Sequence, residues 1–295
     1  MTAAISSVST HPPSIEQVCE QALRLPCSPA LLPRLTAVLV SNDSSADEIA
    51  EIIKLDASLA TATLRLANSA FFSSVPVETI TDAVVRLGQR ELYRLAALAL
   101  VSRWEAASSS GEPGDFCRHA LCTALAAEVL AETSERVDPQ TAYTAGLVCD
   151  MGKLAVAHAC AAFFPAIREQ CATRGGTWAQ AEHDLLGFSH AEVAARLLAS
   201  WSFPPVLTAA VEFCERPRQG PENAQALLAH LHAGKYIATS FGPGVAEEGF
   251  LFELDSAFLI EWGFTPELLQ ETMAIVHDRA KQRLQHRLAH GAVTL

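Results

Sequence analysis

The chain has few aromatic residues and no dense group of basic ones. Only 7% of its 295 residues are Phe, Trp or Tyr, whereas 50% are hydrophobic, mainly Ala and Leu. Because strands favour β-branched and aromatic side chains, this composition favours packed helices. The formal net charge is −12. Without a basic face to follow a phosphate backbone, we do not expect DNA or RNA as a partner.

Paired cysteines and long apolar runs are also missing. The eight cysteines include no CxxC pair, and most lie in apolar stretches where a free thiol behaves as a small hydrophobic side chain. The first residues show neither a basic start nor an apolar run, and no uninterrupted apolar stretch reaches the roughly 18 residues of a membrane span. We therefore expect a soluble, reduced, cytoplasmic protein without membrane association.

Segments rich in Ser, Pro and Gly divide the chain into three parts. Residues 1–13 are rich in Ser, Thr and Pro and predict a disordered tail. Helical patterns then fill residues 14–107 and 115–290, and a Ser/Gly/Pro-rich break separates them. The sequence predicts an all-α fold with two helical subdomains. Within the first, the patterns predict a helix from Ser14 to about Leu25 and another over residues 28–40.

Several helix boundaries can be placed from single residues. Ser45 and Glu48 have the spacing of a capping box, and Asp56 is a natural N-cap for the following helix. Gly88 predicts the end of a short helix. Asp138 followed by proline predicts the start of the next segment.

The stretch AYTAGLVCDMGKLAVA, residues 142–157, places one acidic side chain among small apolar ones. A carboxylate in such surroundings is costly unless a partner neutralises it, so the environment of Asp150 is the central functional question. An interior ion pair or a backbone cap is the simplest interpretation of Asp150. The same stretch predicts a turn at Gly152.

A family resemblance follows from several motifs in the expected order. The runs ADEIAEIIKLDASLATATLRLANSAFF and ITDAVVRLGQRELYRLAAL resemble the HDOD family, the HD-related output domain of bacterial signalling proteins. The similarity extends from about Leu25 to about Ala238. It implies an N-terminal bundle of short helices packed on a degenerate HD-like helical bundle. It also implies a signalling module without catalysis.

The resemblance also indicates where a metal-dependent HD enzyme would hold its ion. His119 and Asp150 match two of the four ligand positions, but Cys149 stands at the place of a histidine and Lys235 at that of an aspartate. A thiolate can bind zinc, whereas a protonated ammonium has no lone pair and repels a cation. We therefore predict no bound metal, no cofactor and no catalytic residue, and that Lys235 pairs with Asp150.

Other interpretations of these residues remain open. His119 is equally well explained as a satisfied core histidine, and Cys149 as an inert buried thiol. His190 lies in a segment that resembles the family's GxxHAExG motif, yet a helix N-cap or surface role would also explain it. Lys235 could instead extend to solvent from an apolar helix. The five residues His119, Cys149, Asp150, His190 and Lys235 together form the predicted vestigial pocket.

The functional prediction is regulatory. We expect a non-enzymatic output or adaptor module that binds a signalling protein in trans or a small nucleotide. Two alternatives are a metal-dependent phosphohydrolase with an atypical site and an oligomeric scaffold. Asn68, Ser69 and Phe72 end an apolar helix with polar and aromatic groups, so we expect them at the contact between the two subdomains, where buried amides find partners.

Overall fold

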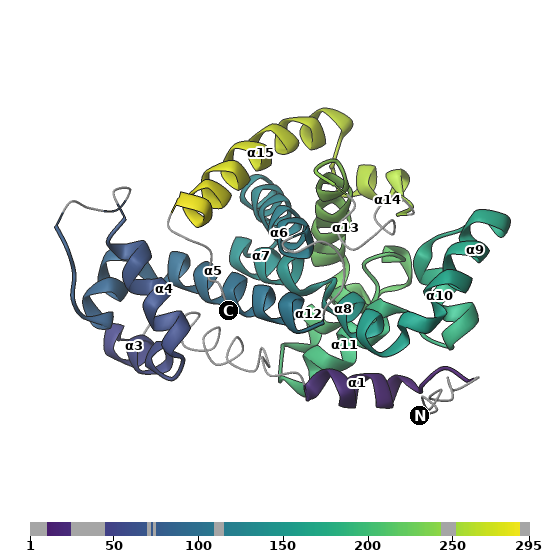
Figure 1. The fold of residues 1–295 in the computed structure, drawn as a ribbon. Coiled ribbons are helices and arrows are strands. Elements are labelled where there is room, and N and C mark those ends of the chain that lie inside the picture. The colour runs from purple at the N-terminus through teal and green to yellow at the C-terminus, as the bar shows by residue number, and fades with distance from the viewer. Residues whose placement is uncertain are drawn as a thin grey trace, which may run out of the picture.

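A computed structural model gives the structure of the chain. It describes residues 11–24, 45–69, 72, 75–108, 115–242 and 252–289. These ranges contain helices and no strand, which confirms the predicted all-α fold (Figure 1). Most of the predicted tail, the predicted helix over 28–40 and most of the Ser/Gly/Pro-rich break lie outside the described residues.

The first part contains α1 (Ile15–Leu23), α3 (Ala46–Lys54), α4 (Ala57–Ala67) and α5 (Ile80–Ser108). Helices α3 and α4 begin where Ser45 and Asp56 predict, whereas the helix expected to open at Thr81 or Asp82 begins at Ile80. Ser45 and Glu48 form both hydrogen bonds of the predicted capping box, and the Asp56 carboxylate accepts from the Leu59 amide. The predicted break at Gly88 is also present, because this residue interrupts α5 with a φ of 72°.

The second part begins at α6 and contains most of the helices. It comprises α6 (Asp115–Ser134), α7 (Pro139–Val148), α8 (Met151–Cys160), α9 (Phe164–Arg174), α10 (Trp178–Leu186), α11 (His190–Ser200), α12 (Pro205–Glu212), α13 (Gln225–Thr239), α14 (Ser256–Glu261) and α15 (Pro266–Ala289). As predicted, α7 starts after Asp138, whose carboxylate accepts from the Thr141 amide.

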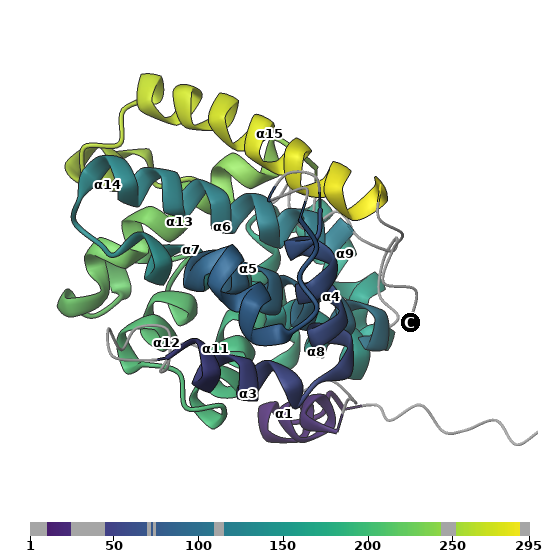
Figure 2. The same ribbon diagram turned by 90° about the vertical axis from the view of Figure 1, so that its left-hand side faces the viewer.

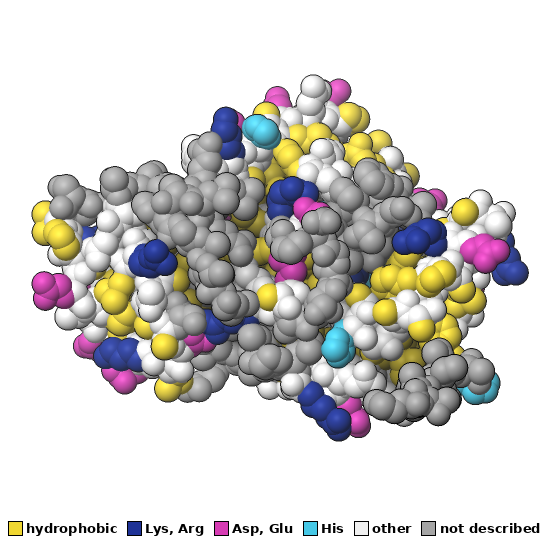
Figure 3. All heavy atoms as spheres, viewed as in Figure 1, with side chains coloured by type: hydrophobic (Ala, Val, Ile, Leu, Met, Phe, Trp, Pro, Cys, Tyr) yellow, Lys and Arg dark blue, Asp and Glu magenta, His cyan; other side chains and the backbone are white. Residues whose placement is uncertain are grey.

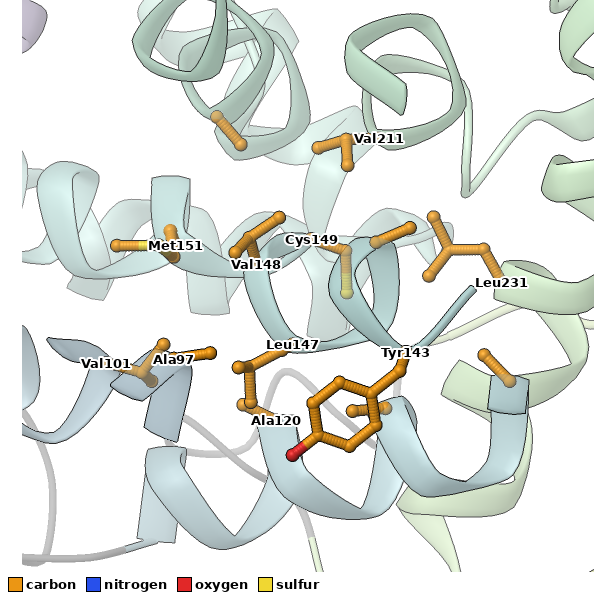
Figure 4. Close-up of a cluster of buried hydrophobic side chains, with 14 of the residues drawn as sticks. Ala97, Val101, Ala120, Tyr143, Leu147, Val148, Cys149, Met151, Val211 and Leu231 are labelled. Atoms are coloured by element: carbon orange, nitrogen blue, oxygen red, sulfur yellow. The ribbon is translucent and has the colours of Figure 1, made fainter. Parts of the chain in front are cut away.

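The second part is built around α6 and α7. Helix α6 packs against α7, α13 and α15, and α15 lies across the top of the molecule in Figures 1 and 2. Helix α1 precedes the first block in sequence but packs against α8 and α11 of the second. One hydrophobic core is continuous through both parts, and Figure 4 shows its centre, where side chains of α5, α6, α7 and α13 meet.

The chain turns two to three residues before the glycine at which the sequence pattern predicts the turn. The turn lies at Cys149 and Asp150, between α7 and α8, while Gly152 is inside the first turn of α8. A Cβ at Gly152 would overlap the carbonyl oxygen of His190, so this glycine serves the close approach of α8 to α11. The prediction of a turn at Gly152 was therefore wrong, because close packing requires the glycine.

Polar contacts between the two blocks come from α5. Arg94 forms an ion pair with the buried carboxylate of Glu128 on α6, and the Tyr93 hydroxyl lies 2.7 Å from the Thr144 hydroxyl on α7. Both pairs lie in the interior. Buried polar contacts between the two blocks, which were expected at Asn68, are thus made by α5.

Asn68 was expected at the contact between the two blocks because a buried amide would need a partner there, and that reason was wrong. Its side chain is exposed, and its amide forms two hydrogen bonds with the backbone of Val77, at 2.9 and 2.7 Å, within the first block. Asn68 closes its own loop and needs no partner from the second block. Ser69 is buried and Phe72 packs at the edge of the core. Their place at the subdomain contact stays a prediction.

One stretch of the described chain, residues 139–174, is apolar and helical enough to pass a length and composition test for a membrane span. In its most apolar window 67% of the residues are buried inside the fold. This stretch is divided among α7, α8 and α9, and its buried residues lie mainly in α7 and α8. On the face in Figure 3, Lys and Arg side chains of the described residues are scattered singly among hydrophobic and acidic ones.

Candidate functional site

Asp150 lies at the junction of α7 and α8, and its side chain is buried. Its Oδ1 atom is 2.9 Å from the Lys235 ammonium of α13 and 3.3 Å from the Lys153 ammonium of α8. The pairing of Lys235 with Asp150 that the sequence predicts is thus present. Lys235 is 2% exposed, so it does not extend to solvent.

His119 and Cys149, the other early members of the predicted pocket, flank this pair. The Nε2 atom of His119, on α6, is 3.3 Å from Oδ2 of Asp150. The Cys149 thiol donates instead to the Gly146 carbonyl at 3.3 Å, within its own helical turn. Burial, and next the nearby Asp150 charge, hold the pKa of Cys149 well above its usual range. As predicted, this thiol is buried and is not activated as a nucleophile.

Glu215 completes the environment of the lysine, and the sequence analysis did not identify it. It follows α12 and places Oε1 at 2.9 Å from the Lys235 ammonium and 3.1 Å from Nε2 of His190. The ammonium therefore bridges two carboxylates that come from segments 65 residues apart in sequence. One fixed cation joins α8, α13 and the end of α12.

His190 is the first residue of α11 and is 1% exposed. The N-cap of α11 is the preceding Ser189, so neither the N-cap nor the surface interpretation of His190 holds. Its Nδ1 atom lies 2.7 Å from Oε2 of Glu182, which also accepts from the His190 backbone amide at 2.8 Å. The other oxygen of Glu182 accepts from the Trp178 indole at 3.0 Å. Glu182 thereby fixes the orientation of the imidazole.

The charged groups of this buried cluster keep one another ionised. Burial by itself would raise the pKa of Asp150, but Lys153 and Lys235 outweigh it and hold that pKa well below its usual range. Burial likewise opposes the charge of Lys235, yet Asp150 foremost raises its pKa well above the usual range. For His190, Glu182 and Glu215 overcome burial and raise the pKa to about 10. The imidazole is therefore protonated at neutral pH.

The same geometry tests whether a metal ion fits. Asp150, His190 and Glu215 offer ligand atoms that all lie within 4.8 Å of one another, as the ligands of a divalent ion do. However, the Lys235 ammonium stands 2.9 Å from both carboxylates. It has three protons and no lone pair, and the imidazolium of His190 has none either. The residues present do not fit a divalent metal, because their own cations already satisfy the carboxylates.

Most residues of this cluster were predicted from the sequence, but its two glutamates were not. The structure places His119, Asp150, His190 and Lys235 in one connected network, with Cys149 beside it. Glu215 directly follows Phe213 and Cys214, a place where HD-like sequences often have a pair of histidines, and that adjacency was the available signal. Glu182 had no such signal, since it lies in a helix whose neighbours His183 and Asp184 are polar.

Comparison with known proteins identifies relatives of this chain. The family model described as "HDOD domain" matches residues 25–217. No match was found among the curated proteins. Several solved structures, among them three from Shewanella, Marinobacter and Geobacter, match most of this chain.

The solved structures carry different descriptions. A "Putative phosphohydrolase" from Shewanella amazonensis SB2B has a TM-score of 0.69 and 27% identity, covering 94% of this chain and 98% of that one. A "Putative signal transduction protein" from Marinobacter aquaeolei VT8 has a TM-score of 0.67 and 26% identity, covering 91% of this chain and 59% of that one. An HDOD domain protein of unknown function from Geobacter sulfurreducens has a TM-score of 0.67 and 23% identity, covering 93% and 96%.

Proposed function

The chain belongs to the HDOD family, and we propose that it is a non-catalytic signalling module of that family, acting by binding a protein partner or a small nucleotide. The single observation that carries this proposal is the position of the Lys235 ammonium, 2.9 Å from both Asp150 and Glu215. In a metal-dependent hydrolase, the ion at such carboxylates activates water. Here a side chain of the protein itself neutralises them.

The electrostatics of the site support the same function. A bound divalent ion generates hydroxide by lowering the pKa of its water, whereas an ammonium and an imidazolium offer no coordination position for water. The two cysteine thiols nearest to the cluster, Cys149 and Cys214, have pKa values raised foremost by burial, to about 11 for Cys214. They are protonated at neutral pH and do not act as nucleophiles. The cluster is suited to hold helices in place rather than to transform a substrate.

The alternative function is hydrolysis of a phosphate ester with the help of a metal. Its support is the three-residue group Asp150, His190 and Glu215, together with the description of the Shewanella relative. For this function the Lys235 ammonium would have to leave a position where it forms two buried ion pairs. Breaking buried pairs of this kind costs several kcal/mol, so we favour the signalling function.

Metal content and hydrolysis distinguish the two functions. We expect the purified protein, incubated with Mn²⁺ or Zn²⁺ and then desalted, to retain well under one ion per chain and to hydrolyse neither bis-p-nitrophenyl phosphate nor a cyclic dinucleotide. The measurements are elemental analysis and a colorimetric assay. One ion per chain that survives mild chelation, together with turnover, would favour the phosphohydrolase.

A designed variant provides the positive control. Lys235→Asp combined with Cys149→His restores an acidic and an imidazole ligand beside Asp150 and His119. We expect this double variant to retain more metal than the wild type under the same desalting. The matched control is Lys54→Ala, which removes an exposed lysine paired with Glu51 and leaves the metal content unchanged.

A further inference from the structure

Residues 252–264 lie against the side of α13 that carries Lys235. The ring of Phe252 stands 5.7 Å from the Lys235 ammonium, in the geometry of a cation–π contact, and 4.9 Å from the ring of His232. Phe258 of the same segment is buried, and its ring lies 6.4 Å from that of His232. We call residues 252–264 the cap segment. It covers the ammonium at the centre of the buried cluster.

His232 is the polar link between the cap segment and α13. Its Nδ1 atom donates to the carbonyl of Cys214 at 2.7 Å, so its Nε2 atom is free to accept and takes the Asp255 amide at 3.0 Å. This bond requires a neutral ring. A proton on Nε2 would place an N–H against the N–H of Asp255, and the bond would be lost.

His230 serves as an internal contrast on the same helix. Its ring packs edge-on against Phe264, the last residue of the cap segment, at 4.9 Å. Its Nδ1 atom donates to the Ala226 carbonyl and its Nε2 atom lies 2.7 Å from the Ser134 hydroxyl. A hydroxyl can donate or accept, so protonation of His230 leaves that bond in place. Of these two histidines, His232 is the one whose charge state is coupled to the attachment of the cap segment.

The remaining polar attachments of the cap segment lie at its surface, while Leu259 and Phe264 join Phe258 in the hydrophobic core. Arg218 pairs with Asp255 at 2.7 Å and with Glu261 at 2.9 Å, and Arg136 donates to the Trp262 carbonyl at 3.0 Å. Exposed ion pairs contribute at most about 1 kcal/mol each. The aromatic contacts and the bond to His232 therefore carry much of the attachment.

We propose that residues 252–264 form a displaceable cap over the buried cluster, and that protonation of His232 releases it. This inference does not depend on whether the cluster is catalytic. Displacement uncovers Lys235 and the Cys214 backbone, so the cap controls access to the cluster from the α13 side. The His230-x-His232 pair, too closely spaced to share one helical face as a metal site, takes on a role in holding this segment.

The direction of the pH effect follows from linkage. Four neighbouring groups act on His232: Lys235 of α13 and the Cys214 carbonyl, Glu215 beyond α12, and Asp255 of the cap. Burial is the largest influence and lowers the pKa of His232 below 6.5; the hydrogen bond to the Cys214 carbonyl opposes it, Lys235 adds to it, and Asp255 and Glu215 oppose it. The closed form is thus favoured above pH 6.5. The free energy that favours the closed form decreases as the pH drops from 6.5 towards the lowered pKa, because the open form binds the proton more readily.

Hydrogen exchange of the full chain tests the proposal. With intrinsic exchange corrected for pH, we expect opening of residues 252–264 to increase by up to about tenfold between pH 7.5 and pH 5.5, the limit that protonation of a group with an ordinary pKa of 6.5 sets. Amides of α8 should keep their protection. Equal opening of the cap at the two pH values, or parallel loss of protection in α8, would overturn the proposal.

Variants assign the effect to His232. His232→Gln keeps an acceptor oxygen for the Asp255 amide but cannot be protonated, so its opening should not depend on pH; a change as large as that of the wild type would contradict the assignment. His158→Gln, at an exposed position, should behave as the wild type.

Should His232→Gln fail to fold, Phe252→Ala removes a cap contact without altering α13. It should increase cap exchange and maleimide labelling of Cys214 relative to buried Cys160 at pH 7.5, and labelling equal to wild type would contradict the cap.

Discussion

At the scale of single residues, the Lys235 ammonium determines how the interior charges are balanced. It contacts Asp150 and Glu215 at 2.9 Å, and both carboxylates have pKa values well below their usual range in spite of burial. A carboxylate that loses such a partner must be desolvated without compensation or take up a proton. The lysine is therefore a structural cation, comparable in position to a bound ion.

The stability of a lysine variant tests this role. Lys235→Ala should lower the free energy of unfolding by about 3–5 kcal/mol, because it breaks the buried ion pairs with Asp150 and Glu215 and removes one cation of the cluster. Urea denaturation followed by circular dichroism gives the difference. Lys54→Ala, at an exposed ion pair, should stay within about 0.5 kcal/mol of wild type. If the two variants were equally stable, Lys235 would have no such role.

At the scale of helices, the cluster depends on the close approach of α8 to α11. Gly152 of α8 meets the backbone of His190 and Ala194, and a side chain there would push α11 away. Since His190 begins α11 and contacts Glu215, a shift of α11 would also open the ion-pair network. The packing of two helices and the geometry of the charges are thus linked through one glycine.

A pair of glycine variants measures that link. Gly152→Ala should cost about 3 kcal/mol, at the upper end of overpacking effects, because the obstructing atoms belong to backbone. Gly234→Ala on α13 is the matched control. Its added Cβ would lie 3.0 Å from the Thr123 carbonyl, and the higher helix propensity of alanine offsets part of the cost. We expect a loss below about 1 kcal/mol for the control, and a Gly152 variant as stable as the control would disprove the close approach.

Helix boundaries were predictable where one side chain determines them and not where packing does. Ser45, Asp56 and Asp138 cap helices through bonds to amides three residues away, so local sequence contained the full signal. Gly152 misled the sequence analysis because a glycine needed for a turn and a glycine needed for contact look alike in sequence. The contact partner, His190, is 38 residues away.

At the scale of the whole molecule, three helices meet at one carboxylate. Glu128 of α6 is 1% exposed and pairs with Arg90 and Arg94 of α5, and its second oxygen is 3.8 Å from Arg279 of α15. Arg279 also contacts Glu132 at 3.0 Å. The first block and the C-terminal helix are therefore held to α6 by the same group.

Removing that carboxylate should affect both contacts. Glu128→Gln should reduce the free energy of unfolding by about 3 kcal/mol, since it removes the buried counter-charge of Arg94 and leaves only the partly exposed Glu91 beside it. Protection of α15 in hydrogen exchange should decrease in parallel. Glu132→Gln, at a partly exposed position, should cost less than about 1 kcal/mol. Unchanged protection of α15 in the Glu128 variant would show that the helix is held by its apolar face alone.

The candidate site could be predicted only in part, for physical reasons. An acidic residue in an apolar stretch must have a partner, which led from Asp150 to Lys235. Glu182 and Glu215 lie in polar surroundings in sequence, and only the tertiary fold buries them against His190. Asn68 misled in the opposite direction, because the backbone of Val77, nine residues later, satisfies its amide locally.

The balance of charge at the cluster also constrains how such a protein changes over generations. Asp150, Glu182 and Glu215 face an equal number of cations, Lys153, Lys235 and the protonated His190. Replacing Lys235 by Asp leaves two excess negative charges, the charge of one divalent ion. In the genetic code, however, lysine and aspartate codons differ at two positions, and the single-step intermediates encode Asn or Glu. Asn leaves one excess negative charge and Glu leaves two, so either single-nucleotide step removes the charge balance that Lys235 provides to the buried cluster.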